Sequence, residues 1–155
     1  MMRLAGLVLW IGLVVSGGCS SFSRDYAAID QAQAAGNITG AWAGEWKSNG
    51  GHQGALRCIL TQTATPAAPN AAGPQKVTYD AQFEAKFWGL FTAHYSTPLA
   101  GTIDHGTAHL TGDHELTGLG GGHYHYEADV TPGKFDATYR SEVDQGVFRM
   151  TRPAK

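Results

Sequence analysis

The chain has 155 residues, of which 43% are hydrophobic and only 15% charged, and it contains 21 glycines. Its length fits one domain, since domains run to about 100–200 residues. The formal net charge of −2 lacks the basic character of nucleic-acid-binding proteins, so we expect no nucleic-acid partner. Abundant glycine with few charges favours a turn-rich β protein over a coiled coil or a helix bundle.

The N-terminal residues have the pattern of an export signal. Arg3 supplies one positive charge, and residues 4–15 form an unbroken apolar run. This run is too short to span a bilayer core of about 30 Å, but it suits the apolar region of a signal peptide. We therefore expect residues 1–18 to be a signal peptide.

The next segment, Ser-Gly-Gly-Cys-Ser at 16–20, resembles the lipobox of bacterial lipoproteins, with Ser16 where that family usually has Leu. The resemblance implies that Cys19 is lipidated, that the partner is a membrane, and that the protein lies in the bacterial cell envelope. Ser20 after the cysteine implies the outer membrane, facing the periplasm. The alternatives are an ordinary secretory signal and a Cys19–Cys58 disulfide.

Residues 19–39 are small, polar and rich in alanine, and we expect them to be a tether between the anchor and the domain. Within this tether the stretch Asp25–Ala35 predicts a short helix, with Tyr26 and Ile29 on one side and Gly36 at its end.

From residue 40 to 153 apolar and polar residues alternate, which is typical of half-buried strands. Turn signals divide this part into eight strands, and eight antiparallel strands joined by short turns favour a closed up-and-down barrel of the lipocalin-like kind. A two-sheet β-sandwich is the alternative. We expect positive φ angles at His105-Gly106 and a type II turn at Pro132-Gly133. The other turns are 49–51, the loop 64–75, 88–90, the glycine-rich loop 118–122 and 144–146.

An even number of strands lets the last strand pair with the first. Setting Phe148 opposite Trp46 brings Arg152 opposite Trp42 on the inner face, where a cation over an indole ring is worth about 0.5–2 kcal/mol. We predict that these four residues close the barrel.

Gly40-Ala41-Trp42 on the first strand, together with Arg152 on the last, resembles the lipocalins and the wider calycin group. In that family the Gly-x-Trp motif and a C-terminal basic residue pack together at the closed end of an eight-stranded barrel. The extended pattern from Gly40 to Trp46 is similar to the first strand of nitrobindin-like haem barrels. Their haem-ligating histidine lies near the C-terminus, and this sequence has no histidine after His125, so we expect no cofactor.

The expected registers also predict a pocket inside the barrel. Two tight turns set Ala85 against Ala93 and Ala128 against Ala137, and coinciding alanine layers would leave a slot lined by aromatic rings. The alternative is that the inward aromatic side chains fill the barrel. The expected ligand-binding residues are Tyr79, Ala85, Ala93, Tyr95, His114, Tyr124, Tyr126 and Tyr139.

Three of the seven histidines suggest chemistry. His123 and His125 would lie about 7 Å apart on one strand face, but zinc needs a third ligand from a neighbouring strand, and we favour an outward polar ladder without metal. His114 has inward parity, and there it could orient a polar ligand group or act as a base. A β-bulge at Gly112 would turn it outward, and we favour that bulge.

These patterns predict a lipid-anchored, non-enzymatic module that binds a small apolar or amphipathic ligand inside a β-barrel. The first alternative is a filled barrel that serves as a structural or protein-interaction lipoprotein, through its outer face or the loops 64–75 and 118–122. The second is a metal-dependent enzyme that uses His123 and His125. No nucleophile triad, paired interior carboxylates or phosphate-binding glycine motif indicates catalysis. Nothing in the sequence fixes the oligomeric state.

Overall fold

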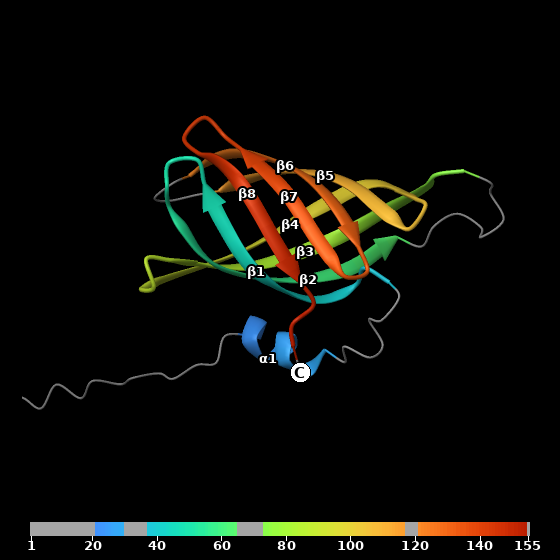
Figure 1. Ribbon diagram of the computed structural model, residues 1–155, viewed down its shortest axis with the longest axis horizontal. Helices are drawn as coiled ribbons and strands as arrows, with labels where there is room; N and C mark the ends of the chain where they lie inside the picture. Colours follow the sequence, from blue (N-terminus) through green and yellow to red (C-terminus); the bar gives the residue numbers. More distant parts are fainter. Residues whose placement is uncertain (1–20, 30–36, 65–72, 117–120, 155) are drawn as a thin grey trace, which may run out of the picture.

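The computed structural model describes residues 21–29, 37–64, 73–116 and 121–154, which form a closed barrel of eight strands and one helix (Figure 1). Each strand is antiparallel to its neighbours, and the last strand pairs with the first. The predicted up-and-down barrel is confirmed, and the two-sheet sandwich is wrong. The elements are α1 (Ser21–Ala28), β1 (Gly40–Ser48), β2 (Gln53–Ala64), β3 (Gln75–Phe87), β4 (Phe91–Asp104), β5 (Thr107–Leu116), β6 (Gly122–Thr131), β7 (Lys134–Arg140) and β8 (Gln145–Thr151).

The core is built by the alternation in the sequence. Along β3, Val77, Tyr79, Ala81, Phe83 and Ala85 are all buried, because successive side chains of a strand point to opposite faces. The same period on the other strands brings one apolar face of every strand into a single interior cluster. The hydrophobic interior therefore runs around the whole barrel.

The pairing of β1 with β8 closes the barrel in the predicted register. Trp46 lies opposite Phe148, and Gly44 lies opposite Met150. A Cβ atom on Gly44 would lie 2.0 Å from the backbone oxygen of Arg149, so only glycine lets the two strands approach this closely.

The two ends of the barrel differ. We call one the Arg152 end; it carries the 105–106 and 132–133 turns and the C-terminal residues. There the Arg152 guanidinium carbon lies 3.9 Å from the centre of the Trp42 ring, which is fully buried, as the sequence predicts. Its guanidinium also donates hydrogen bonds to the backbone oxygens of Asn37, Thr39, Ala41 and Pro132.

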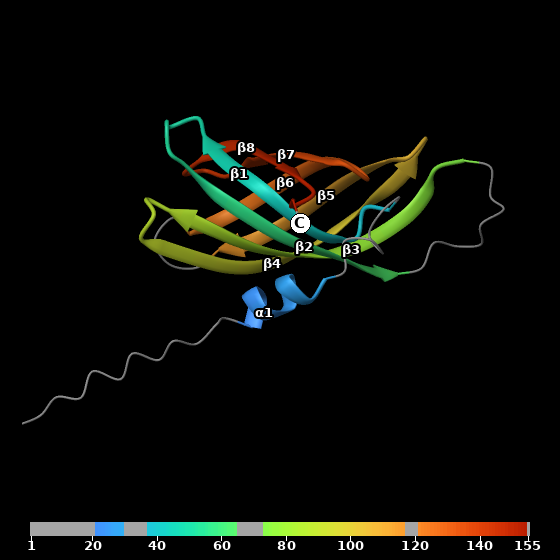
Figure 2. The ribbon, with the colours of Figure 1, turned by 60° about the horizontal axis from the view of Figure 1, so that its bottom comes forward.

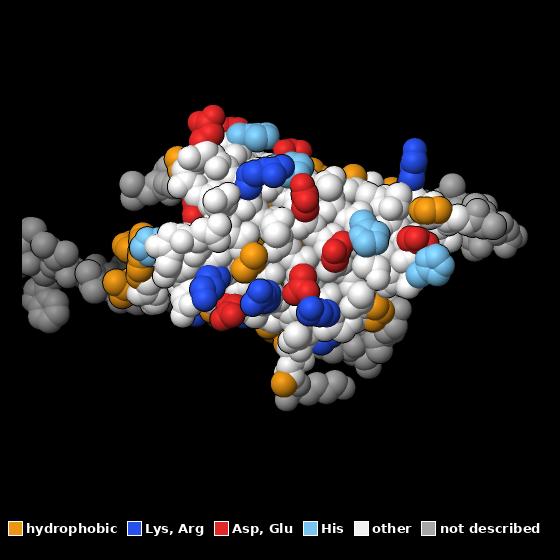
Figure 3. All heavy atoms as spheres, turned by 45° about the horizontal axis from the view of Figure 1, so that its top comes forward, with side chains coloured by type: hydrophobic (Ala, Val, Ile, Leu, Met, Phe, Trp, Pro, Cys, Tyr) orange, Lys and Arg blue, Asp and Glu red, His pale blue; other side chains and the backbone are white. Residues whose placement is uncertain are grey.

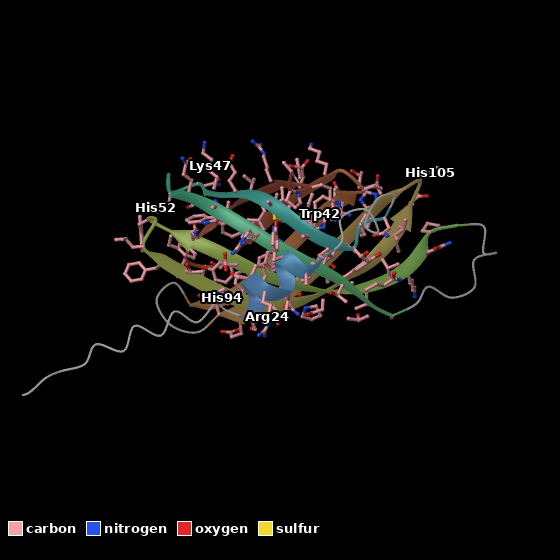
Figure 4. All side chains as sticks on the ribbon, turned by 90° about the horizontal axis from the view of Figure 1, so that it is seen from below. Arg24, Trp42, Lys47, His52, His94 and His105 are labelled. Atoms are coloured by element: carbon pink, nitrogen blue, oxygen red, sulfur yellow. The ribbon has the colours of Figure 1, made fainter. Side chains whose placement is uncertain are left out.

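The opposite end, which we call the Trp88 end, carries the turns β1–β2, β3–β4 and β7–β8. Trp46 lies towards this end, and its indole NH donates to the Lys86 oxygen at 2.9 Å. Figure 4 labels His52 at this end and His105 at the other.

Two predicted turns have different outcomes. His105 and Gly106 have φ angles of 48° and 82°, which confirms the positive φ expected there. Gly133 is not among the residues with positive φ, so the predicted type II turn is wrong, because that type needs positive φ at its second central residue. Pro132 fixes φ at the first central position, which suits a type I turn equally well.

The wall of the barrel has a seam between β4 and β5. Their pairing extends only to Ala100 opposite Thr111, although both strands continue towards the Trp88 end. Pro98 has no backbone NH to donate at the next position, which explains why the ladder stops there. Across the seam the Thr97 hydroxyl donates to the backbone oxygen of Asp113 at 3.2 Å.

The bulge predicted at Gly112 is wrong. The β5–β6 pairing runs without a register shift from Ala108 to Leu116, so His114 keeps its inward parity opposite Tyr124. Gly112 serves a close approach instead, since a Cβ atom there would lie 2.5 Å from the Pro98 oxygen.

Helix α1 lies outside the barrel, over β2, β3 and β4 (Figure 2). Phe22 and Tyr26 stack one turn apart, with ring centres 5.7 Å apart, and the Phe22 ring lies 5.8 Å from that of His94. The predicted helix was placed too late in the chain, because these two rings, and not Tyr26 with Ile29, hold it on the barrel. Residues 30–35 of the predicted helix, and Gly36 at its end, lie outside the described residues.

A partly buried ion pair lies beneath the helix. Arg57 of β2 donates to Glu84 of β3 at 2.6 and 2.9 Å, and the Glu84 side chain is only 5% exposed. The Arg57 guanidinium also lies 4.9 Å from the centre of the Tyr26 ring. Because a buried carboxylate is costly without a partner, Arg57 stabilises Glu84, and the same guanidinium packs against the rings of the helix.

Several predicted features fall on residues that the structure does not describe. These are the signal peptide at 1–18, the lipidated Cys19, and most of the loops 64–75 and 118–122. Cys58 is free and fully buried in the barrel. Among the described residues, α1 lacks the length and apolar character that a membrane-crossing helix needs.

Candidate functional site

The interior pocket was predicted from two layers of alanines. Ala85 pairs with Ala93 and Ala128 pairs with Ala137, as expected from the turns. Each layer, however, has a large residue on an adjacent strand. Leu56 lies opposite Ala85, Leu110 opposite Ala128, and Phe148 opposite Ala137.

Phe148 occupies the space that the slot would have needed. The centre of its ring lies 5.0 Å from that of Tyr139, 6.0 Å from that of Tyr126 and 5.7 Å from that of Phe83. Phe83 belongs to β3, whereas Tyr126 and Tyr139 belong to β6 and β7 on the other side of the barrel. One ring that touches both walls leaves the centre of the barrel packed.

Five of the eight predicted ligand-binding residues form one aromatic chain towards the Trp88 end. Consecutive ring centres along it lie 5.8 to 6.5 Å apart. Tyr79 is also buried but lies apart from this chain, opposite Leu99 and nearer the Arg152 end. The chain runs through His114, Tyr95, Tyr126, Tyr124 and Tyr139.

Burial favours the neutral form of three phenols of this chain, those of Tyr95, Tyr126 and Tyr139. Burial raises the pKa of Tyr95, Tyr126 and Tyr139 above the ordinary value of 10.0, and at Tyr139 the neighbouring Asp144 raises it further. The Tyr139 hydroxyl donates to Asp144 at 2.9 Å, and the Ser48 hydroxyl donates to the other oxygen of that carboxylate at 2.5 Å. These groups can orient a hydrogen-bonding partner, but as neutral phenols they are not prepared for proton abstraction.

The seam between β4 and β5 is where this chain meets solvent. Tyr95 and His114 face each other across it, with stacked rings, and both are half-buried. The inward orientation of His114 places its imidazole where a polar group that enters through the seam would meet it. Sequence reasoning missed the seam, although Pro98 in the middle of an apparent strand was a usable signal.

The outward histidines form the predicted polar ladder. His123 Nε2 and His125 Nδ1 lie 3.1 and 3.0 Å from the same oxygen of Asp113 on β5. Hydrogen bonds from His125 and His123 lower the pKa of the Asp113 carboxyl. Within the part of the chain that the structure describes, no group of three such residues has the geometry to hold a metal ion. Asp113 is a member of the ladder that the sequence did not single out.

A groove lies on the outside of the barrel, over β1 and β5–β8. Its volume is about 1070 Å³, and no residue of β2, β3 or β4 lines it. Figure 3 looks onto this side, where acidic, basic and histidine side chains are interspersed. Sequence reasoning missed the groove because strand curvature creates it. The outward side chains that line it are Ala43, Glu45, His109, Thr111, Glu127, Asp129, Lys134, Asp136, Thr138, Val147, Arg149 and Thr151.

The charges in the groove alternate in sign and partly pair with one another. His109 Nδ1 lies 2.6 Å from Asp129, and Lys134 contacts Asp136. Arg149 and Glu45 lie on adjacent strands in register. A lining of interspersed charges and threonines suits a polar, extended partner better than an apolar molecule.

Comparisons with known proteins add no identity: no family model, no curated protein and no solved structure matches this chain.

Proposed function

We propose that this protein is a lipid-anchored, non-enzymatic barrel of the bacterial cell envelope that acts through its outer surface, as a protein-interaction lipoprotein. The observation that carries this is the Phe148 ring, which contacts Phe83 and Tyr139 from opposite walls and fills the barrel centre. The outer groove over β1 and β5–β8, with a volume of about 1070 Å³, supports a function on the outer surface. The proposed partner is an extended polar peptide segment of another envelope protein.

The anchor is part of the proposal. The segment 16–20 supports lipidation at Cys19, on the outer membrane and facing the periplasm. Mass spectrometry of the protein extracted from membranes tests this directly. We expect acyl chains on an N-terminal Cys19, and an unmodified cysteine would contradict the anchor.

Photo-crosslinking in living cells tests the groove. A photoreactive amino acid replaces Val147 in the groove, and in a matched variant it replaces Lys76, which is exposed on β3 away from the groove. We expect a defined crosslinked species from position 147 and not from 76. Equal crosslinking from both positions, or none from 147, would contradict the proposed surface.

The seam favours a second candidate function, the binding of a small amphipathic ligand by Tyr95 and His114. The half-buried Tyr95–His114 stack at the break between β4 and β5 is the observation behind it. Native mass spectrometry separates the two functions. A bound small molecule that is lost in His114→Ala would favour ligand binding. A measured mass that equals the protein plus its acyl chains, with nothing else bound, would support the packed barrel.

A further inference from the structure

The turn between β3 and β4 exposes a group of large apolar side chains. Trp88 is 68% exposed, Leu90 83% and Phe91 63%, whereas almost every other large apolar side chain described is at least partly buried. Trp88 has a φ angle of 51°, a left-handed conformation that is uncommon for a bulky residue. In Figure 3 apolar side chains gather at this end of the molecule.

These side chains form an ordered tip. The Trp88 ring lies 6.3 Å from that of Phe91, 6.2 Å from that of Phe87 and 6.1 Å from that of His52. The Leu90 NH donates to the Phe87 oxygen at 3.1 Å, which fixes the turn. A tip that is already ordered loses little conformational freedom when it is buried against another surface.

The position of α1 indicates what that surface is. Phe22 in its first turn contacts His94, which lies three residues beyond Phe91 on β4, or about 10 Å along the strand. Figures 1 and 2 both show the first turn of α1 directed towards the end of the barrel that carries the β3–β4 turn. Cys19 precedes Ser21 by two residues, which span at most about 7 Å.

We infer that the Trp88–Phe91 tip inserts into the interfacial layer of the same membrane that holds the lipid on Cys19; this rests on the proposed anchor. Because α1 is held on the barrel, so short a connection keeps the first turn of α1 at the bilayer surface and the tip near it. Tryptophan and other apolar side chains are favoured at that interface. The exposed Lys86 beside the tip suits anionic lipid headgroups. The tip would thus be a second membrane contact that sets the orientation of the barrel.

Quenching of tryptophan fluorescence tests the inference. The full chain is produced in a bacterium that processes lipoproteins and is reconstituted into phosphatidylethanolamine–phosphatidylglycerol vesicles with or without brominated acyl chains. Trp42 and Trp46 are only 0% and 6% exposed, so Trp88 is the tryptophan of the barrel that lipid can reach. We expect brominated lipid to quench part of the emission, and Trp88→Phe to abolish that quenching. Unquenched emission from a protein shown to carry the lipid, or unchanged quenching in Trp88→Phe, would overturn the inference.

A charge variant adds a matched control. Leu90→Asp places a charge on the tip, whereas Val143→Asp places one on the exposed β7–β8 turn at the same end but away from α1 (Figure 1). We expect the quenching to fall strongly in Leu90→Asp and to persist in Val143→Asp, with unchanged melting temperatures. Equal quenching in the two variants would overturn the inference. A Cys19 without lipid would instead overturn the anchor, so the two failures are distinguishable.

Discussion

Trp42 and Trp46 lie on the same face of β1, yet their surroundings at the two ends of the barrel differ. Trp42 is fully buried, its indole NH donates to the Ile38 oxygen at 3.1 Å, and Arg152 covers its ring. Trp46 packs on Phe87, with ring centres 4.8 Å apart, and Phe87 leads into the exposed Trp88. At the Arg152 end, the Ile38 backbone and the Arg152 side chain cover the Trp42 ring. At the Trp88 end, the rings of Trp88 and Phe91 stay exposed. The first arrangement serves stability, and the second leaves a surface available for binding.

The same substitution at the two ends gives the largest contrast. Trp42→Ala removes a fully buried ring and should destabilise the fold by about 3–5 kcal/mol. Trp88→Ala removes an exposed ring and should change stability by no more than about 0.5 kcal/mol. Urea unfolding of both variants measures this difference. Similar losses of stability from the two variants would show that the Trp88 ring is packed as firmly as the Trp42 ring.

The pairing of β1 with β8 runs between the Arg152 end and the Trp88 end and closes the barrel. Gly44→Ala tests this pairing. The added methyl group would clash with the backbone of Arg149 and Met150, so we expect a loss of about 1–3 kcal/mol or more. Gly133→Ala is the control, because nothing lies within 4 Å of a Cβ atom there. Thermal and urea unfolding should separate the two variants. A Gly44→Ala protein as stable as Gly133→Ala would contradict the closure of the barrel by β1 and β8.

Arg152→Ala should weaken the Arg152 end by about 1–2 kcal/mol, through loss of the contact with Trp42 and of the hydrogen bonds to backbone oxygens. Lipid contact at the Trp88 end should be unaffected. Arg149→Ala on β8, three residues earlier, removes an exposed guanidinium and serves as the control. Melting temperatures provide the measurement, and equal values for both variants would show that Arg152 does not hold this end together.

Alkaline pH tests the burial of the interior phenols. Tyr126 and Tyr139 have folded-state pKa values raised above 10.0, so the fold favours their neutral forms. Their contribution to stability is complete below pH 10 and is lost as the pH rises further, because the unfolded chain ionises first. Urea unfolding between about pH 8 and pH 11, a range that brackets the ordinary tyrosine pKa, should show this loss of stability. The decline should be shallower in Tyr126→Phe. A stability independent of pH in this range would contradict the burial of these phenols.

Neighbouring strands were predictable from the sequence because tight turns fix register. The pairs Ala85–Ala93 and Ala128–Ala137 follow from turn length and alternation. The closure of Trp46 on Phe148 was instead predicted from the even number of strands and from matching large residues across the first and last strands. The filling of the interior was not predictable in this way. It depends on how far the strands are staggered around the barrel, which decides that Phe148 reaches both Phe83 and Tyr139.

Features outside the barrel were harder to predict. The outer groove depends on strand curvature, and the place of α1 depends on contacts of Phe22 and Tyr26 with residues far along the chain. The favoured bulge at Gly112, and with it the outward orientation of His114, was wrong because a glycine in a strand has two explanations, a bulge or a close approach. At Gly112 the explanation is the close approach, to the backbone of Pro98.

Nuclear Overhauser contacts of the Phe148 ring test the central claim, a closed barrel with a packed interior, most directly. We expect contacts from this one ring to both Phe83 on β3 and Tyr139 on β7, whose ring centres lie 5.7 and 5.0 Å away. Contacts to Tyr139 alone, with none to Phe83, would mean an open space between β3 and β7 and would contradict a packed interior.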